Sequence, residues 1–163
     1  MASEDIKKVG EMIKGIRFAM MTTIGETGNL HSRPMAVQEM DFDGDFWFFT
    51  SSHSGKIESI EHDQHVNLAF TKESDNKWIS IAGRAQMVTD RAKIKELWNP
   101  LMKTWFPKGV DDPELCLIRV GAESAEYWDA PNSKIVHLYG LAKAIVTGQR
   151  PNPGDHDRVD LKH

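Results

Sequence analysis

The feature that most constrains the fold is a succession of short apolar segments joined by turns rather than by helices. Strands are predicted over residues 17–24, 30–40, 46–49, 66–70, 78–88, 115–120 and 125–128. Gly, Asn, Asp and Ser residues separate most of these segments, which is typical of hairpins. Hairpin connections favour antiparallel pairing, because parallel neighbours need long crossover connections. The sequence therefore predicts a mainly β fold, an antiparallel barrel or rolled sheet with flanking helices, and not a doubly wound parallel sheet.

Helical spacing of apolar residues occurs in four segments around these strands. Helices are predicted over residues 3–15, 54–62, 90–98 and 132–146. Ser3, Ser54 and Asp90 stand where an N-cap side chain would bond the first turn. Gly15 and Gly148 stand where the first and last of these helices would end.

The length of 163 residues favours one domain with room for a real core. We expect that single domain to span residues 1–148. Residues 149–163 form a polar tail with two prolines, either disordered or laid along the surface.

Two residues inside the predicted strands interrupt regular pairing. Pro34 cannot donate to a strand ladder, so it indicates an edge, a bulge or a ligand as the neighbour, and a plain edge strand is the commonest of these. Gly83 predicts a bulge or bend in the strand over residues 78–88.

Residues 45–60 combine a buried aromatic strand, a hydroxyl-rich turn and the start of a helix. Thr50, Ser51 and Ser54 lead to Lys56 at the expected first helical turn. Free N–H groups at a helix N-terminus favour an anion, hydroxyls add donors and the lysine adds a full charge. This order suits a phosphate, and an ordinary polar turn before an N-capped helix is the alternative. The spacing of the P-loop nucleotide-binding motif is absent.

Composition and charge exclude several classes of protein. The formal net charge of −4 argues against a nucleic-acid or membrane-surface binder. The single cysteine, Cys116, permits no internal disulfide, and its apolar neighbours predict a buried, inert thiol. We find no signal peptide and no long apolar run, so we expect a cytoplasmic protein.

Other candidate sites are weak. His62 and His65 invite a metal site, but a zinc site needs three or four ligands and no further cluster follows. The nucleophile elbow of the α/β-hydrolases and the glycine fingerprint of dinucleotide-binding folds are both absent. Three basic residues, Arg33, Lys56 and Arg84, are far apart in the sequence. For each, a solvated position on the surface is the usual interpretation, and an anion-binding site is the alternative.

Four stretches, taken in order, resemble the pyridoxamine 5'-phosphate oxidase-like family, whose fold is an FMN-binding split barrel. Within that family the similarity is to the bacterial general stress proteins. The stretches are residues 32–35, residues 49–56, residues 83–86 with Val88 and Asp90, and residues 126–129. The resemblance runs from the first helix to Gly148, and its specificity lies in the order and spacing of the stretches.

The resemblance implies FMN as the cofactor, with FAD as an alternative, held by a homodimer with the flavin at its interface. Arg33, Thr50, Ser54 and Lys56 would bind the phosphate and the ribityl chain, and main chain of residues 33–37 would follow the isoalloxazine edge. Further contacts are implied for Pro34, Met35, Phe49, Ser51 and Trp78, and for Trp128 of the other subunit. Trp78 stands where the oxidases carry a glutamine, so its contact would differ in kind.

One departure from the family limits the function that can be transferred. The true oxidases carry an R-L-H-x-R run soon after the late tryptophan, whereas residues 131–137 contain no arginine. The resemblance therefore implies the fold and FMN, not oxidation of vitamin B6 phosphates. It favours an FMN-dependent oxidoreductase with a small-molecule electron donor or acceptor. The alternatives are a non-catalytic flavin-binding or flavin-sensing stress protein and a barrel that has lost the flavin and serves as an interaction module.

Overall fold

The computed structural model describes residues 2–129 and 155–161. Seven strands in these ranges form one sheet in the order β2-β1-β4-β5-β6-β3, and β7 pairs with β6. All of its strand pairs are antiparallel, which confirms the predicted fold class. The strands are β1 (Phe18–Ile24), β2 (Leu30–Ala36), β3 (Asp45–Ser51), β4 (His65–Lys72), β5 (Lys77–Val88), β6 (Leu115–Asp129) and β7 (Asp155–Asp160).

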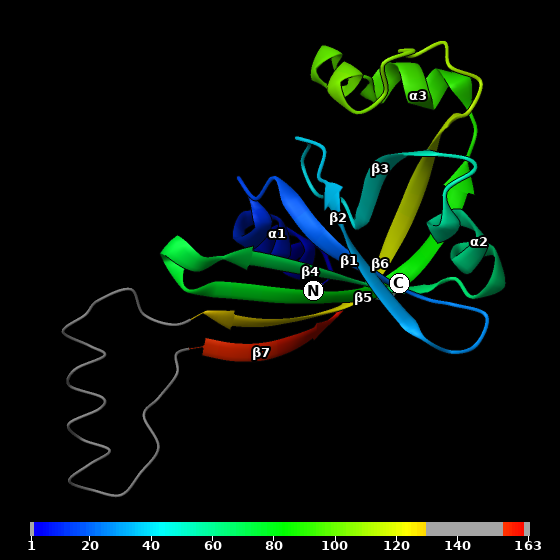
Figure 1. Cartoon of the computed structure of the whole chain (residues 1–163). Coiled ribbons are helices and arrows are strands. Elements are labelled where there is room, and N and C mark those ends of the chain that lie inside the picture. Colours follow the sequence, from blue (N-terminus) through cyan, green and yellow to red (C-terminus); the bar gives the residue numbers. More distant parts are fainter. Residues whose placement is uncertain (1, 130–154, 162–163) are drawn as a thin grey trace, which may run out of the picture.

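The sheet curves around a core that two helices help to cover (Figure 1). The helices are α1 (Ala2–Ile13), α2 (Gly55–His62) and α3 (Arg91–Leu97), and short 3-10 turns occupy η1 (Glu73–Asp75) and η2 (Pro100–Thr104). α1 contributes Val9 and Met12 to this main core, and α2 contributes Ile57 and Ile60. Their apolar residues recur at helical spacing, so each helix buries one face.

Alternation along the strands defines the inner face of the sheet. Met21, Leu68 and Ile81 lie in one cross-strand row on β1, β4 and β5 and are fully buried in the main core. Residues that alternate with them face outward, because successive strand side chains point to opposite faces.

A second, smaller core lies on the outer side of β3 and β6, under α3 and η2. Phe49 packs edge-on against Trp98 with the ring centroids 5.6 Å apart, and Ile94 and Met102 are buried beside it. The predicted cap of α3 is confirmed, since Asp90 accepts a hydrogen bond of 3.0 Å from the backbone N–H of Ala92.

The two strands predicted over 115–120 and 125–128 are instead one continuous strand, β6. The small and polar residues 121–123 resemble a turn in the sequence, yet β5 pairs with β6 on both sides of them. The register shifts between Ala82 and Gly83, which confirms the irregularity predicted at Gly83. A Cβ atom on Gly83 would lie 2.4 Å from the carbonyl oxygen of Gly121, so only glycine fits there.

The ends of some elements differ from the predictions. α1 begins at Ala2, so Ser3 lies inside the helix and not at its cap. β2 ends at Ala36 and not near residue 40. β2 lies at one end of the strand order, as expected for a strand that contains Pro34.

The C-terminal part of the sequence contains a strand that we did not predict. β7 lies inside the predicted polar tail, and Leu161 beyond it is 2% exposed. The segment DHDRVD lacks apolar alternation, so pairing with β6 defines this strand and local sequence does not. The helix predicted over residues 132–146 lies outside the described residues.

Candidate anion-binding site

The hydroxyl-rich turn after β3 gathers around one lysine. Lys56 Nζ donates a hydrogen bond of 3.0 Å to Oγ1 of Thr50, and the hydroxyls of Thr50 and Ser54 lie 3.2 Å apart. Ser54 occupies the predicted N-cap position of α2, but its side chain makes no capping bond. Instead, the Ser54 hydroxyl faces Thr50, so the turn presents its polar groups to the lysine.

A second cation comes to the same place from the edge strand β2. Arg33 Nη1 donates a hydrogen bond of 2.7 Å to Oγ1 of Thr23 on β1. Thr23 is fully buried, and Thr50 is 2% exposed. Arg33 lies near enough to Lys56 to repel it electrostatically. We call Arg33, Thr50, Ser54 and Lys56 the cation cluster.

The electrostatics of the cation cluster favour a bound anion. Burial lowers the pKa of Lys56 below its ordinary value, repulsion from Arg33 lowers it further, and Cys116 opposes this shift. Burial also lowers the pKa of the Arg33 guanidinium. Within residues 2–129 and 155–161, no Asp or Glu forms an ion pair with either cation. In the described part of the chain, two partly desolvated positive charges therefore lie together without a negative partner, an arrangement that an anion would stabilise.

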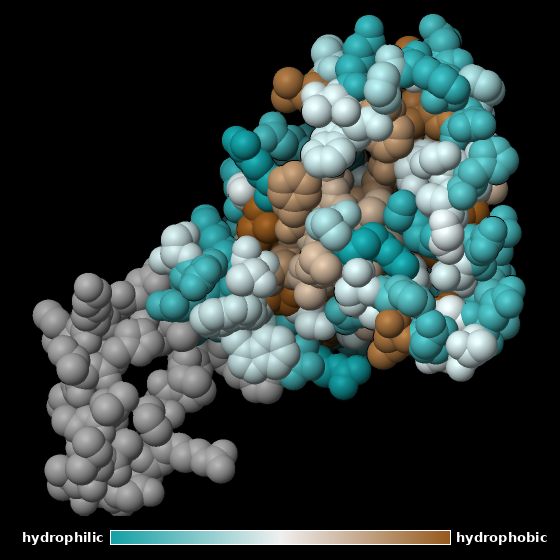
Figure 2. Space-filling view, viewed as in Figure 1, coloured by the Kyte–Doolittle hydropathy of each residue, from teal (hydrophilic) through white to brown (hydrophobic). Residues whose placement is uncertain are grey.

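The cation cluster lies between β2 and the β3–α2 turn, and apolar surface is close to it. Figure 2 shows apolar side chains gathered over the region of β1, β2 and β3, with polar residues around them. A ligand with a phosphate and a flat apolar ring fits this combination, since the phosphate needs charge-assisted donors and the ring needs apolar walls.

Some predicted site residues do not point into the cation cluster. Met35 is buried in the main core, and Phe49 is buried in the smaller core. Pro34 is exposed on β2, and the hydroxyl of Ser51 accepts a hydrogen bond of 3.4 Å from the backbone N–H of His53. The flavin contacts of these four residues stay predictions.

The two predicted tryptophans form a cross-strand pair. Trp78 on β5 is opposite Trp128 on β6, and they are 40% and 37% exposed. Trp78 alternates with the buried Ile79 and therefore faces outward. Arg33 lies in the row of Met21, whose side chain points into the core. Within one chain, the tryptophan pair thus lies on the opposite face of the sheet from the cation cluster.

Sequence reasoning missed Thr23, which holds Arg33. A signal for it exists, because Thr23 follows Met21 at the next inward position of the same strand. A hydroxyl at an inward position is buried, and buried polar groups almost always have a partner. The sequence does not say which residue that partner is.

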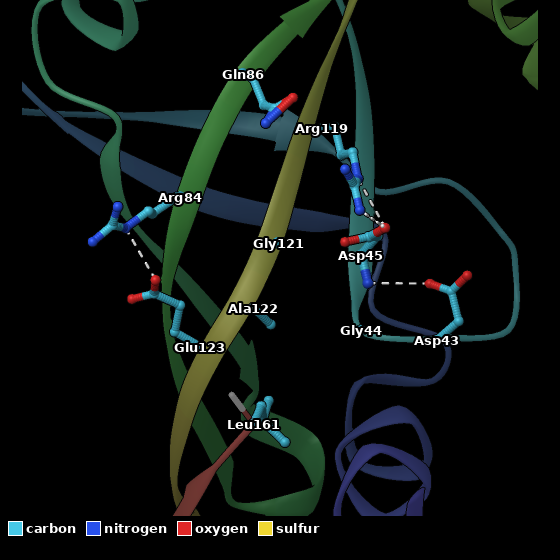
Figure 3. Close-up of a pocket in the computed structure, with 10 residues that line it drawn as sticks. All are labelled: Asp43, Gly44, Asp45, Arg84, Gln86, Arg119, Gly121, Ala122, Glu123 and Leu161. Atoms are coloured by element: carbon cyan, nitrogen blue, oxygen red, sulfur yellow. Dashed lines mark hydrogen bonds and ion pairs between the residues drawn. The ribbon is translucent and has the colours of Figure 1, made fainter. Parts of the chain in front are cut away.

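A separate cavity of about 580 Å³ lies beside β5 and β6 (Figure 3). Its walls carry two ion pairs, Arg84 Nε to Glu123 Oε1 at 3.0 Å and Arg119 Nη2 to Asp45 Oδ2 at 2.7 Å. Arg84 is therefore matched to a carboxylate, which favours a surface role over an anion site. The cavity is lined by Asp43, Gly44, Asp45, Arg84, Gln86, Arg119, Gly121, Ala122, Glu123 and Leu161. Of these, the sequence offered Arg84 as a candidate for an anion site, and none is a predicted flavin contact.

The histidine segment after α2 forms a local pair. The backbone N–H of His65 donates to Asp63 Oδ1 at 3.0 Å, and His65 Nδ1 lies 2.7 Å from the same oxygen; the backbone bond first and the side-chain bond second lower the pKa of Asp63. Among the residues that the structure describes, no group of three or more His, Cys, Asp or Glu residues is placed to hold a metal ion.

Cys116 has the environment that the sequence predicts. It is 1% exposed on β6, opposite Thr50, and it forms no disulfide. Burial raises the pKa of its thiol, so the thiolate is disfavoured.

None of the helices in the described part of the chain has both the length and the apolar character needed to cross a membrane.

Comparison with known proteins identifies the family. Residues 4–152 match the family model described as "Pyridoxamine 5'-phosphate oxidase like". The chain is 31% identical to protein bli-3 of Neurospora crassa over 156 residues, which covers 90% of this chain and 75% of that protein.

Solved structures show the same fold. The general stress FMN/FAD binding protein from Xanthomonas citri is 34% identical, with a TM-score of 0.67 over 78% of this chain and 89% of that chain. General stress protein 26 from Bacillus anthracis is 24% identical, with a TM-score of 0.65 over 78% of this chain and 94% of that chain. The curved antiparallel sheet is thus the split barrel expected from the resemblance, and the chain belongs to the pyridoxamine 5'-phosphate oxidase-like family.

Proposed function

We propose that this protein binds FMN and acts as an FMN-dependent oxidoreductase with a role in the stress response. The observation that carries the proposal is the cation cluster, where Arg33 and Lys56 lie together on buried threonine hydroxyls without an acidic partner among the described residues. Similarity to the Xanthomonas citri protein, which is described as FMN/FAD binding, supports a flavin.

The residues of the cation cluster would hold the phosphate. Arg33 and Lys56 would supply charge-assisted donors, each worth roughly 1.5–3 kcal/mol. The hydroxyls of Thr50 and Ser54 would add donors beside them. When bound, FMN supplies hydride and electron transfer, and the protein orients it and excludes water. We expect main chain of residues 33–37 to lie along the ring.

We further propose a homodimer with the flavin at its interface. The outer face of the sheet exposes several large apolar side chains, namely Phe18 (51%), Met20 (43%), Trp78 (40%) and Trp128 (37%). Exposed apolar area of this kind marks an interaction surface, and a second copy related by a twofold axis is the commonest partner. Trp128 of the second copy would then reach the flavin that Trp128 of the same chain does not approach. Light scattering that shows a flavin-loaded monomer would contradict the dimer.

The substrate is not a vitamin B6 phosphate in this proposal. A second dianion near the flavin phosphate needs its own cationic donors, and bidentate arginines suit that role best. Residues 131–137 supply Lys134 and no arginine. We expect the FMN-loaded protein to form no pyridoxal 5'-phosphate from pyridoxamine 5'-phosphate in air. Sustained turnover near the enzyme median of about 10 per second would overturn this.

One experiment tests the central proposal and separates it from the alternatives. The protein is purified, its absorption spectrum is recorded, and the released flavin is identified as FMN or FAD by chromatography. A colourless preparation that does not bind added flavin would point to an interaction module. A yellow protein is then mixed with NADH or NADPH under anaerobic conditions. Bleaching followed by reoxidation with a defined acceptor indicates an oxidoreductase, and stable colour favours flavin binding or sensing without turnover.

A further inference from the structure

Each cation of the cluster is held by a threonine from a neighbouring strand, and one of these threonines has no assigned role. Thr50 on β3 accepts from Lys56 at 3.0 Å, and Thr23 on β1 accepts from Arg33 at 2.7 Å. Both threonines are almost completely buried, and among the described residues no buried side-chain nitrogen or oxygen lacks a partner. The contact of Thr23 with Arg33 is therefore a fixed part of the folded protein.

The direction of the Arg33 side chain shows what this contact does. In the strand ladder, Arg33 is opposite Met21, and Thr23 is opposite His31. The Arg33 side chain thus leaves its own row and reaches diagonally along β1 to Thr23. Without this acceptor, the long arginine side chain would have several staggered conformations to choose from.

We propose that Thr23 is a positioning residue, which orients the Arg33 guanidinium toward the flavin phosphate and so favours phosphorylated over unphosphorylated flavin. This inference rests on the proposed flavin binding. Thr23 takes one of the five guanidinium N–H donors and leaves the others for a ligand. A carboxylate at the same place would pair bidentately with Arg33 and neutralise it. A threonine fixes the direction of the guanidinium and keeps its charge for the phosphate.

The residue type suits the role. A threonine in a strand is restricted about χ1, so its hydroxyl is held in one direction without a further partner. Complete burial of Thr23 also removes competing water from the hydrogen bond, and Arg33 itself is only partly buried.

The test compares two ligands that differ only in the phosphate. Dissociation constants for FMN and riboflavin are measured by flavin fluorescence for the wild-type protein and for Thr23→Val, which keeps the side-chain shape and removes the acceptor. We expect the valine variant to bind FMN roughly tenfold more weakly, as for the loss of one hydrogen bond to a charged group. Riboflavin binding should stay within about twofold, and Thr23→Ser should restore most of the FMN affinity.

A matched control lies one residue away on the same strand. Thr22 bonds Ser32 through its hydroxyl at 2.6 Å, also across β1 and β2, but on the opposite face of the pair. Thr22→Val therefore removes a comparable hydroxyl without touching Arg33. We expect it to leave the ratio of FMN to riboflavin affinity unchanged.

A double-mutant cycle shows whether Thr23 acts through Arg33. Thr23→Val should have no further effect on FMN affinity in an Arg33→Met background. If valine at position 23 prevents folding, as judged by circular dichroism, Thr23→Ala takes its place because it only removes atoms.

The possible failures are distinguishable. A wild-type protein that binds neither flavin overturns the proposed function. A wild-type protein that prefers FMN, combined with a Thr23→Val variant that keeps this preference or loses FMN and riboflavin equally, overturns the positioning role and leaves flavin binding intact.

Discussion

Two regions of this split barrel each bring two cations close to the sheet, and they treat the charge differently. In the cavity of Figure 3, Arg84 and Arg119 each contact a carboxylate, Glu123 and Asp45 respectively. In the cation cluster, Arg33 and Lys56 contact threonine hydroxyls. The cavity thus neutralises its arginines within the fold, whereas no carboxylate of the described residues pairs with the two cations of the cluster.

The difference supports the proposal that the cation cluster binds an anion and that the cavity does not. Burial and mutual repulsion disfavour the charged forms of two cations that have no counter-ion among the described residues, and both effects lower the pKa of Lys56. A protein selected only for stability would pair or remove them. Retaining them suggests a ligand that recovers the unfavourable free energy when it binds.

The largest expected effect comes from reversing one charge in each region. Lys56→Glu should weaken FMN binding by at least about 100-fold, because it removes a charge-assisted donor and adds a repelling carboxylate. Arg84→Glu reverses an equal charge in the cavity and should leave FMN affinity unchanged. Fluorescence titration measures both, and circular dichroism checks the folds. Equal losses in the two variants would contradict the division between the regions.

The next effect concerns stability at the β-bulge beside the cavity. Gly83→Ala places a Cβ atom 2.4 Å from the Gly121 carbonyl oxygen, so β5 and β6 must move apart. We expect the free energy of unfolding to fall by about 2 kcal/mol. Urea unfolding monitored by tryptophan fluorescence measures this loss. At low temperature, where the variant is folded, its FMN affinity should equal that of the wild-type protein. Loss of FMN binding with normal stability would contradict a purely structural role for Gly83.

The pH dependence of binding tests the cation cluster without changing its shape. Burial and repulsion from Arg33 lower the pKa of Lys56 from 10.5, and a bound phosphate should raise it again. At pH values between the pKa of Lys56 in the free protein and its pKa in the complex, FMN binding takes up a proton. The affinity for FMN should therefore fall by up to roughly tenfold per pH unit as pH rises through this range. Lys56→Arg stays charged and should flatten the profile.

The same lowered pKa affects the stability of the flavin-free protein in the opposite direction, so that the free energy of unfolding rises with pH where the affinity for FMN falls. In this pH range the unfolded chain binds more protons at Lys56 than the folded chain does. The contribution of Lys56 to the free energy of unfolding should therefore increase as pH rises. Unfolding measured at several alkaline pH values, with Lys56→Met as the reference, checks this sign.

The smallest expected effect is the loss of an ion pair in the cavity. Arg119 bonds Asp45 through two nitrogens, at 2.8 Å and 2.7 Å, and its side chain is 42% exposed. Arg119→Met should lower the free energy of unfolding by about 1 kcal/mol or less, since partly exposed pairs contribute little. FMN affinity should not change. If Arg119→Met lowered the free energy of FMN binding more than the free energy of unfolding, the cavity would be part of the FMN-binding site.

Local pattern was sufficient to predict much of this fold. Alternation and turn residues predicted the antiparallel sheet, and the order of strand, hydroxyl turn and lysine predicted that Thr50, Ser54 and Lys56 lie together. Their role toward a flavin came from the family resemblance and stays a prediction.

Features set by pairing between distant strands could not be predicted. In the sequence, β6 resembles two strands separated by a turn near Glu123. Pairing with β5, through the bulge at Gly83, makes it one strand in the fold. β7 has no apolar alternation and depends on β6. Thr23 could be recognised as a buried hydroxyl, but naming Arg33 as its partner requires both the register of the β1–β2 hairpin and the diagonal reach of the arginine side chain.

The position of β3 in the sheet also sets the order in which the binding site can form. In the described sheet β3 pairs only with β6, residue 45 opposite residue 121 and residue 51 opposite residue 115. β1 and β2 are neighbours in sequence and can pair early, so Arg33 and Thr23 can meet while most of the chain is still to be made. Thr50 on β3 and Lys56 on the helix that follows it, α2, are synthesised soon afterwards, but β3 has no partner strand in the described sheet until β6 arrives. During synthesis on the ribosome, three of the four members of the cation cluster therefore wait for residues 115–121, and the proposed phosphate site is incomplete before they emerge.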